Sequence, residues 1–417
     1  MSVWNINGGK RLEGVIFVQG SKNAVLPIMA ASVISPAVTE LMNVPQISDV
    51  DATLRILRHL GCTAERDGHD VYIDSTTLHE NTVPQVMTEC MRSSVLFMGA
   101  LLARCGEVVL SYPGGCRLGD RPVDLHIGAM RALGAETEET GCEIVCRAKK
   151  LTGAVINLPF PSVGATENAM LAACCAEGET VIHGAAKEPE IVDLQEYLRK
   201  LGAYISGAGT DTVTVSGFSA ETHVGHRISP DRIAASTYLC AAAACGGDIE
   251  LRGVDARQFL CVSHFLNEAG CDIIPTKRSI RLRSNARLHA VGHVSTEPYP
   301  GFPTDAQPLL MAALLKAEGK TVFTENIFDS RFLHAKKLMR FGADISLDGR
   351  DAVVWGVKDL RGAAVSSTDL RGGAAMIIAG LSAEGRTTLI DNGYIDRGYE
   401  ALDLKLRSLG ADIYTEN

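Results

Sequence analysis

The sequence is poor in aromatic side chains, which make up 5% of its 417 residues, and it has no excess of basic charge. Its formal net charge at pH 7 is −9, whereas a surface that binds nucleic acid is basic. It contains no apolar run near the length of about 20 residues that spans a bilayer. The first residues also lack the charged and apolar regions of a signal peptide. These absences predict a cytoplasmic protein with no nucleic-acid partner and no membrane insertion.

Cysteine spacing gives no sign of a metal centre. The chain has 12 cysteines, but no two follow the C-x-x-C spacing, and no cysteine–histidine cluster has the spacing of a zinc site. In a reducing compartment such cysteines are mostly buried free thiols. We therefore expect no metal and no cofactor.

One sequence pattern occurs six times. In each copy a glycine follows an apolar residue and precedes alanine or cysteine, and a second apolar residue stands four positions before the glycine. These two apolar positions share one face of a helix, and glycine readily adopts the left-handed conformation that ends a helix. The pattern therefore predicts six helices, each with one buried face. They are expected to end at Gly61, Gly134, Gly202, Gly270, Gly342 and Gly410, which are 68 to 73 residues apart.

A second, more apolar kind of segment precedes these helices and is followed by a turn glycine and a β-branched run. A helix without a polar face is a buried one. Each repeat is therefore expected to contain one buried helix, one half-exposed helix and several short strands. Six repeats make two sets of three, with a break near residues 225–230. The apolar segments are residues 93–103, 169–176, 234–245, 308–317 and 374–383.

Residues 111–126 do not fit the repeat. They contain Pro113-Gly114-Gly115-Cys116, followed by Arg117 and Arg121. Glycine and proline predict a loop here, and the neighbouring cations favour the thiolate form of the cysteine. From these residues alone, a reactive thiol and an ordinary surface loop are both open.

Two other polar residues stand at expected helix starts. Lys22 precedes an apolar segment and could hold an anion together with free backbone N–H groups, although a solvated lysine is the alternative. Asp305 precedes the segment at 308–317 and fits either a general base or a helix cap.

Three arginines lie beside carboxylates near strand-to-helix turns. They are Arg331, Arg371 and Arg397, next to Asp329, Asp369 and Asp396. Surface ion pairs would explain each one singly. Three in one half of the chain also fit a clamp for phosphate and carboxylate, which the guanidinium fork suits.

Together these stretches resemble the UDP-N-acetylglucosamine enolpyruvyl transferases over nearly the whole chain. The most specific part is Pro113-Gly114-Gly115-Cys116 with Arg121-Pro122-Val123-Asp124-Leu125-His126. The resemblance implies an α/β fold, a two-domain inside-out α/β barrel with three βαβαββ repeats per domain. It implies a first domain of residues 21–229, a second of 1–20 plus 230–417, and an active site between them. Other matching segments are 21–24, 162–166, 188–193, 230–232, 302–305 and 395–400.

The resemblance also implies a reaction. The enolpyruvyl group of phosphoenolpyruvate would move to the 3′-hydroxyl of UDP-N-acetylglucosamine through a tetrahedral intermediate, without metal. This chemistry needs an acid, a base and positive charge around phosphate and carboxylate. By the resemblance, Cys116 is the proton donor and Asp305 the base. The residues expected on phosphate are Lys22, Arg121 and Arg397.

The remaining expected contacts divide by substrate. By the resemblance, Asn23 and Asp305 hold the sugar, and Arg92, Arg331 and Arg371 are auxiliary cations. Asp369 is expected among the substrate-binding residues. The uridine diphosphate pocket would be lined by Arg121, Pro122, Val123, Asp124, Leu125, Ser162, Val163, Gly164 and Ile327.

Some family members carry lysine where this chain has Ser48 and Phe160, so less positive charge near the substrates is expected here. The resemblance further implies the first committed step of peptidoglycan synthesis, inactivation by fosfomycin, and a monomer or weak oligomer. Three alternative functions are open: the sister reaction on shikimate 3-phosphate, an RNA-end-processing protein with related repeats, and a non-catalytic sugar-nucleotide-binding paralogue. The cysteine loop argues against the first, and the acidic chain argues against the second.

Overall fold

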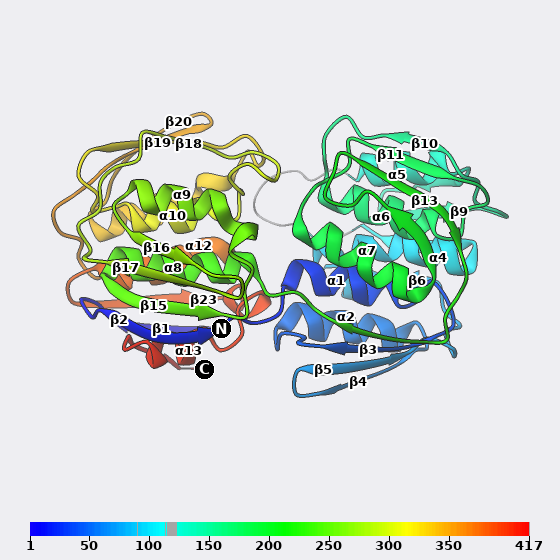
Figure 1. Cartoon of the computed structure of the whole chain (residues 1–417), viewed down its shortest axis with the longest axis horizontal. Helices are drawn as coiled ribbons and strands as arrows, with labels where there is room; N and C mark the ends of the chain where they lie inside the picture. The colour runs from blue at the N-terminus through cyan, green and yellow to red at the C-terminus, as the bar shows by residue number, and fades with distance from the viewer. Residues whose placement is uncertain (90, 113, 115–122, 417) are drawn as a thin grey trace. The chain divides into compact units, whose positions relative to one another are not determined.

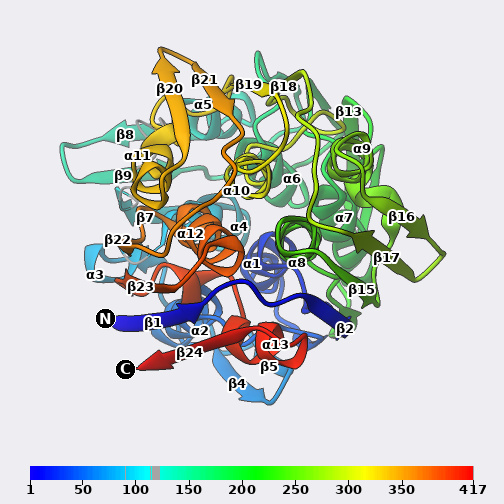
Figure 2. The same cartoon turned by 90° about the vertical axis from the view of Figure 1, so that its left-hand side faces the viewer.

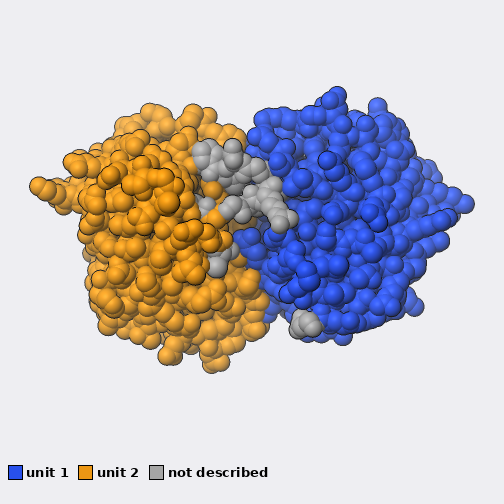
Figure 3. Space-filling view, turned by 180° about the vertical axis from the view of Figure 1, so that it is seen from behind, with its two compact units in different colours: residues 1–19, 116–120, 230–417 blue, residues 20–115, 121–229 orange. Residues whose placement is uncertain are grey.

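The computed structural model describes all residues except 90, 113, 115–122 and 417. The described residues form six sheets of four strands each (Figure 1). They divide into two compact units, coloured differently in Figure 3. Unit 1 contains residues 1–19 and the described residues from 230 onward. Unit 2 contains the described residues between 20 and 229.

All six sheets share one topology. The first two strands in spatial order are parallel, and the other neighbours are antiparallel. Parallel neighbours need a crossover connection, which a helix usually provides. In unit 2 the first sheet has the order β14 (His223–Arg227), β3 (Val38–Met42), β5 (Asp70–Asp74), β4 (Thr63–Asp67). The second has the order β6 (Thr82–Val83), β7 (Glu107–Ser111), β9 (Glu143–Arg147), β8 (Glu136–Glu139). The third has the order β10 (Val155–Asn157), β11 (Thr180–His183), β13 (Thr212–Phe218), β12 (Ala203–Ser206).

Unit 1 repeats this order with two strands from the start of the chain. Its first sheet has the order β2 (Leu12–Phe17), β15 (Gly247–Arg252), β17 (Ser279–Ser284), β16 (Asp272–Pro275). The second has the order β18 (His293–Ser295), β19 (Lys320–Thr324), β21 (Asp351–Trp355), β20 (Asp344–Asp348). The third has the order β22 (Ala364–Ser366), β23 (Arg386–Asp391), β1 (Ser2–Asn7), β24 (Asp412–Glu416).

Three apolar helices form the centre of each unit. In Figure 2 unit 1 faces the viewer, and its three inner helices lie in the middle with the strands around them. These helices are buried along almost their whole length, because their small and aliphatic side chains pack on every side. The predicted arrangement of helices inside and sheets outside is confirmed. The inner helices are α1 (Lys22–Ala31), α4 (Phe97–Cys105) and α6 (Val163–Ala173) in unit 2, and α8 (Arg232–Cys245), α10 (Gln307–Ala313) and α12 (Leu370–Ser382) in unit 1.

The half-exposed helices end where the sequence predicts. All six repeat glycines have positive φ angles, between 88° and 115°, which is the conformation that favours glycine. The apolar residues four positions earlier are all buried. These helices are α2 (Ser48–His59), α5 (Asp124–Ala132), α7 (Pro189–Leu201), α9 (Leu260–Glu268), α11 (Ala335–Leu338) and α13 (Leu402–Ser408).

The helix before Gly342 differs from a single α-helix. It consists of the 3₁₀ turn η3 (Arg331–His334), then α11, then the 3₁₀ turn η4 (Met339–Phe341). The Nδ1 atom of His334 lies 2.9 Å from the Arg331 carbonyl oxygen, which an α-helix would offer to the amide of residue 335. The Ala335 amide bonds the Phe332 carbonyl instead, so this turn takes the tighter 3₁₀ form.

The chain passes between the units at residues 19–20 and 229–230. Among the described residues, no helix combines the length and apolar character needed to cross a membrane. The remaining short helices are α3 (Gln85–Thr88), η1 (Arg92–Leu96), η2 (Ala256–Phe259) and η5 (Ile395–Arg397).

Candidate active site

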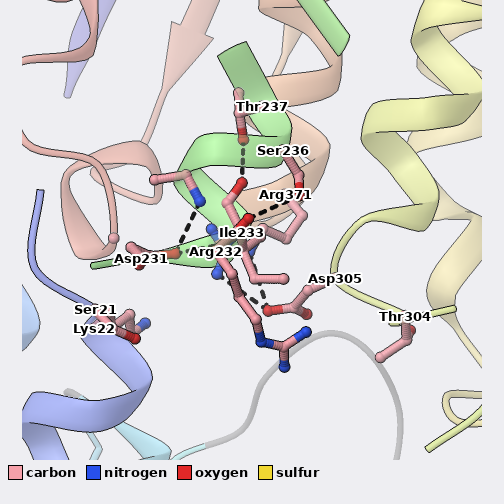
Figure 4. A network of polar contacts seen from close by, with 12 residues as sticks. Ser21, Lys22, Asp231, Arg232, Ile233, Ser236, Thr237, Thr304, Asp305 and Arg371 are labelled. Carbon is pink, nitrogen blue, oxygen red and sulfur yellow. Dashed lines mark hydrogen bonds and ion pairs between the residues drawn. The ribbon is translucent and has the colours of Figure 1, made fainter. Parts of the chain in front are cut away.

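In unit 1 the Asp305 carboxylate is held between two arginines. Asp305 Oδ1 is 3.1 Å from Arg331 Nη2, and Asp305 Oδ2 is 3.1 Å from Arg371 Nη2. The side chains of Arg331 and Arg371 are 1% and 3% exposed, whereas that of Asp305 is 30% exposed. The two cations are therefore buried behind a carboxylate that reaches solvent. Figure 4 shows Asp305 and Arg371 pointing toward each other.

Backbone contacts fix this network in place. Arg331 donates through Nε and Nη2 to the Thr304 carbonyl oxygen at 3.0 and 2.8 Å. Its Nη1 lies 3.6 Å from Asp369 Oδ1. Asp369 caps α12 by accepting from the amides of Arg371 and Gly372. The structure thus brings together four residues from three separate segments of the sequence, and their two positive and two negative charges balance.

Arg371 is held by aromatic as well as acidic neighbours. Its Cζ atom lies 5.3 Å from the centre of the Tyr399 ring, and the Tyr399 hydroxyl is 2.8 Å from Thr237 Oγ1. Burial alone would lower the pKa of the Arg371 guanidinium, but Tyr399, Asp305 and Asp231 outweigh it and raise that pKa. Arg371 is therefore a permanent cation inside the unit.

His334 belongs to the same cluster, although no sequence pattern points to it. The residue is fully buried, and Arg331 and Asp369 interact with it electrostatically. Burial lowers its pKa to about 4, so the ring is neutral near pH 7. The contact of Nδ1 with the Arg331 carbonyl assigns the proton to Nδ1. His334 therefore supports the Arg331 turn without adding charge.

Two further predicted residues of unit 1 are linked to this network. Ile327 is linked to it through hydrogen bonds of Glu325, and Arg397 is close to it in the sequence. Ile327 follows Glu325, whose Oε1 accepts from the Ile327 amide at 2.9 Å and whose Oε2 accepts from Thr304 Oγ1. Arg397 is half-buried at the end of η5, two residues before Tyr399. Asp329 is 77% exposed and pairs with Arg350, so it belongs to the surface.

In unit 2, Lys22 is the first residue of α1. Ser21 caps this helix by accepting from the Ala24 amide, as the sequence predicts for a helix start. Lys22 Nζ lies 2.7 Å from Asp49 Oδ2, and both side chains are largely buried. Asn23 follows in the first turn. Ser48 begins α2, and Phe160 is 42% exposed.

The other predicted residues of unit 2 gather at the starts of two adjacent helices. Asp124 and Leu125 lie in the first turn of α5, after Val123, and Ser162 caps α6 ahead of Val163 and Gly164. A side chain on Gly164 would meet the His126 ring at 3.0 Å, so glycine lets the two helices approach. The two helix starts are thus neighbours. Exposed N–H groups at such starts favour anionic ligands.

A neutral histidine supports this pair of helices. His126 Nδ1 is 2.7 Å from Asn168 Nδ2, and Asn168 also donates to the Val95 carbonyl in η1. Burial, with a smaller effect of Arg92, lowers the pKa of His126 to about 4. Arg92, at the start of η1, therefore lies in the same neighbourhood. Cys116, Arg121 and Pro122 lie outside the described residues.

Comparisons with known proteins agree with this architecture. A solved enolpyruvyl transferase, NikO from Streptomyces tendae, is 25% identical, with a TM-score of 0.90 over 99% of this chain and 98% of its own. The family model for EPSP synthase (3-phosphoshikimate 1-carboxyvinyltransferase) matches residues 6–406. The fold is therefore that of the enolpyruvyl transferases, and the predicted fold class is confirmed.

Curated relatives show which enolpyruvyl transferases the chain resembles in sequence. UDP-N-acetylglucosamine 1-carboxyvinyltransferase 2 of Caldanaerobacter subterraneus subsp. tengcongensis is 46% identical over 99% of both chains. UDP-N-acetylglucosamine 1-carboxyvinyltransferase of Geotalea uraniireducens is 45% identical over 98% of both chains. Within the EPSP synthase family, the chain belongs to the UDP-N-acetylglucosamine 1-carboxyvinyltransferases.

Proposed function

We propose that the protein transfers the enolpyruvyl group of phosphoenolpyruvate to the 3′-hydroxyl of UDP-N-acetylglucosamine and releases phosphate. The observation that carries this proposal is the Asp305 carboxylate, half-open to solvent and oriented by two buried arginines. A carboxylate held in this way is suited to accept a proton from a bound hydroxyl. The names of the relatives supply the acceptor, UDP-N-acetylglucosamine, and the carboxyvinyl group that is transferred, and the sequence resemblance supplies phosphoenolpyruvate as the donor.

The reaction divides into addition and elimination. Cys116 donates a proton to the methylene carbon of phosphoenolpyruvate, and the 3′-oxygen of the sugar bonds to the neighbouring carbon while Asp305 takes the hydroxyl proton. The tetrahedral intermediate then returns a proton from its methyl group to the Cys116 thiolate and expels phosphate, which restores the double bond. Lys22, Arg121 and Arg397 are assigned to the phosphate, where fixed positive charge stabilises the transition state.

The other residues hold and align the substrates. Because Arg331 and Arg371 are buried and contact Asp305, we assign them chiefly to orienting that base. Asn23 is assigned to the sugar, together with Asp305. Arg92 is assigned as a further cation near the substrates. The uridine diphosphate is assigned to residues 121–125, to Ser162–Gly164 at the start of α6, and to Ile327. Asp369 is assigned to positioning Asp305, because it contacts Arg331 and caps α12.

This activity implies a cellular role. We assign the protein to the cytoplasm, at the first committed step of peptidoglycan synthesis, and through it to cell shape and division. It is expected to work as a monomer or weak oligomer, without metal. The two domains are assigned to residues 21–229 and to residues 1–20 plus 230–417, and each contributes residues to the proposed reaction.

The direct test measures phosphate released from phosphoenolpyruvate with either acceptor. Release is expected with UDP-N-acetylglucosamine and not with shikimate 3-phosphate. The opposite preference would support the sister reaction, to which the matching family model owes its name. Absence of turnover with both, alongside binding of UDP-N-acetylglucosamine, would instead indicate a non-catalytic paralogue.

A second test concerns the proton donor. Fosfomycin is a phosphonate epoxide that imitates phosphoenolpyruvate, so a thiol placed to protonate the methylene carbon can also attack the epoxide. Burial raises the pKa of the thiols of Cys62, Cys146 and Cys271 to about 11, which disfavours reaction there. Mass spectrometry should find one adduct, on Cys116, formed faster with UDP-N-acetylglucosamine present.

Two controls sharpen this experiment. Cys142 is exposed, and it should stay unmodified if reaction requires the phosphonate site and not mere exposure. Cys116→Asp should keep measurable turnover but escape inactivation, because a carboxyl can donate a proton but attacks epoxides poorly. An unmodified Cys116 in active, sugar-saturated enzyme would contradict the assignment.

A further inference from the structure

Gln19 is the last residue of unit 1 before the chain passes into unit 2. The residue is only 5% exposed, and both ends of its amide are used. Nε2–H donates to the Gly398 carbonyl oxygen at 3.0 Å, and Oε1 accepts from the Glu400 amide at 2.9 Å. Its own carbonyl oxygen accepts from the Asp231 amide at 2.9 Å. The Gln19 side chain thus holds a backbone segment that is far away in the sequence.

The backbone segment that Gln19 holds includes Arg397. The 3₁₀ turn η5 is only three residues long, and Gly398 follows it directly. Its beginning is tied by Asp391, whose Oδ2 accepts from the Ile395 amide and whose Oδ1 accepts from the Ser367 hydroxyl. A turn this short has few internal hydrogen bonds, so its position depends on outside contacts. Asp391 supplies such a contact before Arg397, and Gln19 supplies one after it.

We infer that Gln19 is a positioning residue for Arg397, acting through the backbone of Gly398 and Glu400. This inference rests on the proposed function, in which the Arg397 guanidinium binds the phosphate of phosphoenolpyruvate. Gln19 itself contacts no substrate in that scheme. Its contribution is geometric, because a reacting group displaced by about 1 Å can lose on the order of 100-fold in rate.

Two variants separate the donor from the acceptor. Gln19→Glu keeps the size and the acceptor for the Glu400 amide, but as a carboxylate it repels the Gly398 carbonyl instead of donating to it. Gln19→Ala removes both contacts. We expect kcat/KM for phosphoenolpyruvate to fall about 10- to 100-fold in both, while KM for UDP-N-acetylglucosamine stays near the original value. Amide exchange at Glu400 should accelerate in Gln19→Ala.

Gln195 provides a matched control. It is also 5% exposed, and its Oε1 accepts from the Ala208 amide at 3.0 Å in unit 2. Gln195→Ala removes a buried amide contact of the same kind in the unit that does not contain Arg397. Its melting temperature should fall as in Gln19→Ala, while its kcat/KM for phosphoenolpyruvate stays unchanged.

The decisive comparison repeats Gln19→Ala in an Arg397→Ala background. If Gln19 acts through Arg397, the second substitution adds no further loss, because contributions of coupled residues are not additive. An equal loss in both backgrounds would overturn the inference, as would normal kcat/KM in Gln19→Glu. That variant also carries the test if Gln19→Ala fails to fold. Normal activity in Arg397→Ala would instead refute the phosphate assignment, and the positioning role with it.

Discussion

The two units hold their candidate site residues by different means. In unit 1, Asp305 and Asp369 balance Arg331 and Arg371, and three of these four side chains are at most 7% exposed. In unit 2 the residues assigned to the nucleotide lie at the starts of α5 and α6. There the supporting pair is uncharged, a neutral histidine bonded to Asn168.

This difference indicates a division of labour. A buried ionic network keeps a reacting carboxylate in one place, and removing one partner leaves an uncompensated charge. Helix starts offer backbone N–H groups, which bind an anion without any particular side chain. Substitutions around Asp305 in unit 1 should therefore act mainly on turnover, whereas those at the starts of α5 and α6 in unit 2 should act mainly on binding.

The largest effect is expected from Asp305→Asn. The amide can still occupy the place of the carboxylate, but it cannot accept the proton of the hydroxyl. We expect kcat to fall by about 10²- to 10⁴-fold, the usual contribution of a general base. Phosphate-release assays measure this. Asp329→Asn is the control, since Asp329 is exposed, and its kcat should not change; comparable losses in both variants would break the comparison.

Arg397→Ala should follow closely. The loss of a charge-assisted contact to the departing phosphate is expected to cost about 2–4 kcal/mol in the transition state. Arg397→Lys should recover only part of kcat/KM, because an ammonium cannot form the bidentate fork. Near-normal kcat/KM in Arg397→Ala would show that Arg397 is not a phosphate ligand, and near-normal kcat/KM in Arg397→Lys would show that the bidentate fork is not needed.

Acid should lower the stability of the protein through one buried histidine in each unit. The pKa of His126 and of His334 is lowered to about 4 from 6.5, in both cases mainly by burial. At pH 5 the unfolded chain binds protons that the native histidines do not, so unfolding is favoured. The free energy of unfolding should fall between pH 7 and pH 5 by about 2 kcal/mol for each histidine.

Urea denaturation of His126→Gln and His334→Gln at the two pH values checks this expectation. Each variant should lose part of the pH dependence shown by the original protein. If one variant keeps all of it, the corresponding histidine is not buried and neutral. The two units would then differ more than their structures indicate.

The smallest effect is expected from Ser162→Ala, which removes the cap of α6. A lost cap costs about 1 kcal/mol of stability. Because Ser162 is also assigned to the nucleotide, KM for UDP-N-acetylglucosamine should rise while kcat stays nearly constant. Fluorescence-monitored melting and steady-state kinetics separate the two effects. A fall in kcat without a change in KM would contradict the division between the units.

The sequence predicts the repeated parts of the fold well because their causes are local. The glycine ends of the outer helices follow from residues four positions apart, and the inner helices follow from composition. The balanced network around Asp305 could only be suspected, since Arg371 and Asp305 meet across 66 residues. Gln19 and His334 gave no local signal at all. The Gln19 contact with Gly398 spans 379 residues.

The pairing of the chain's first strand also bears on the order of folding during synthesis. β1 lies between β23 and β24, and β2 pairs with β15. β1 and β2 are therefore synthesised long before their partners, whereas unit 2 has all its described strands once β14 is made. Since domains generally fold as units during translation, the middle of this chain should fold before its beginning. Loss of β24 should leave β1 with an unpaired edge in an otherwise finished molecule.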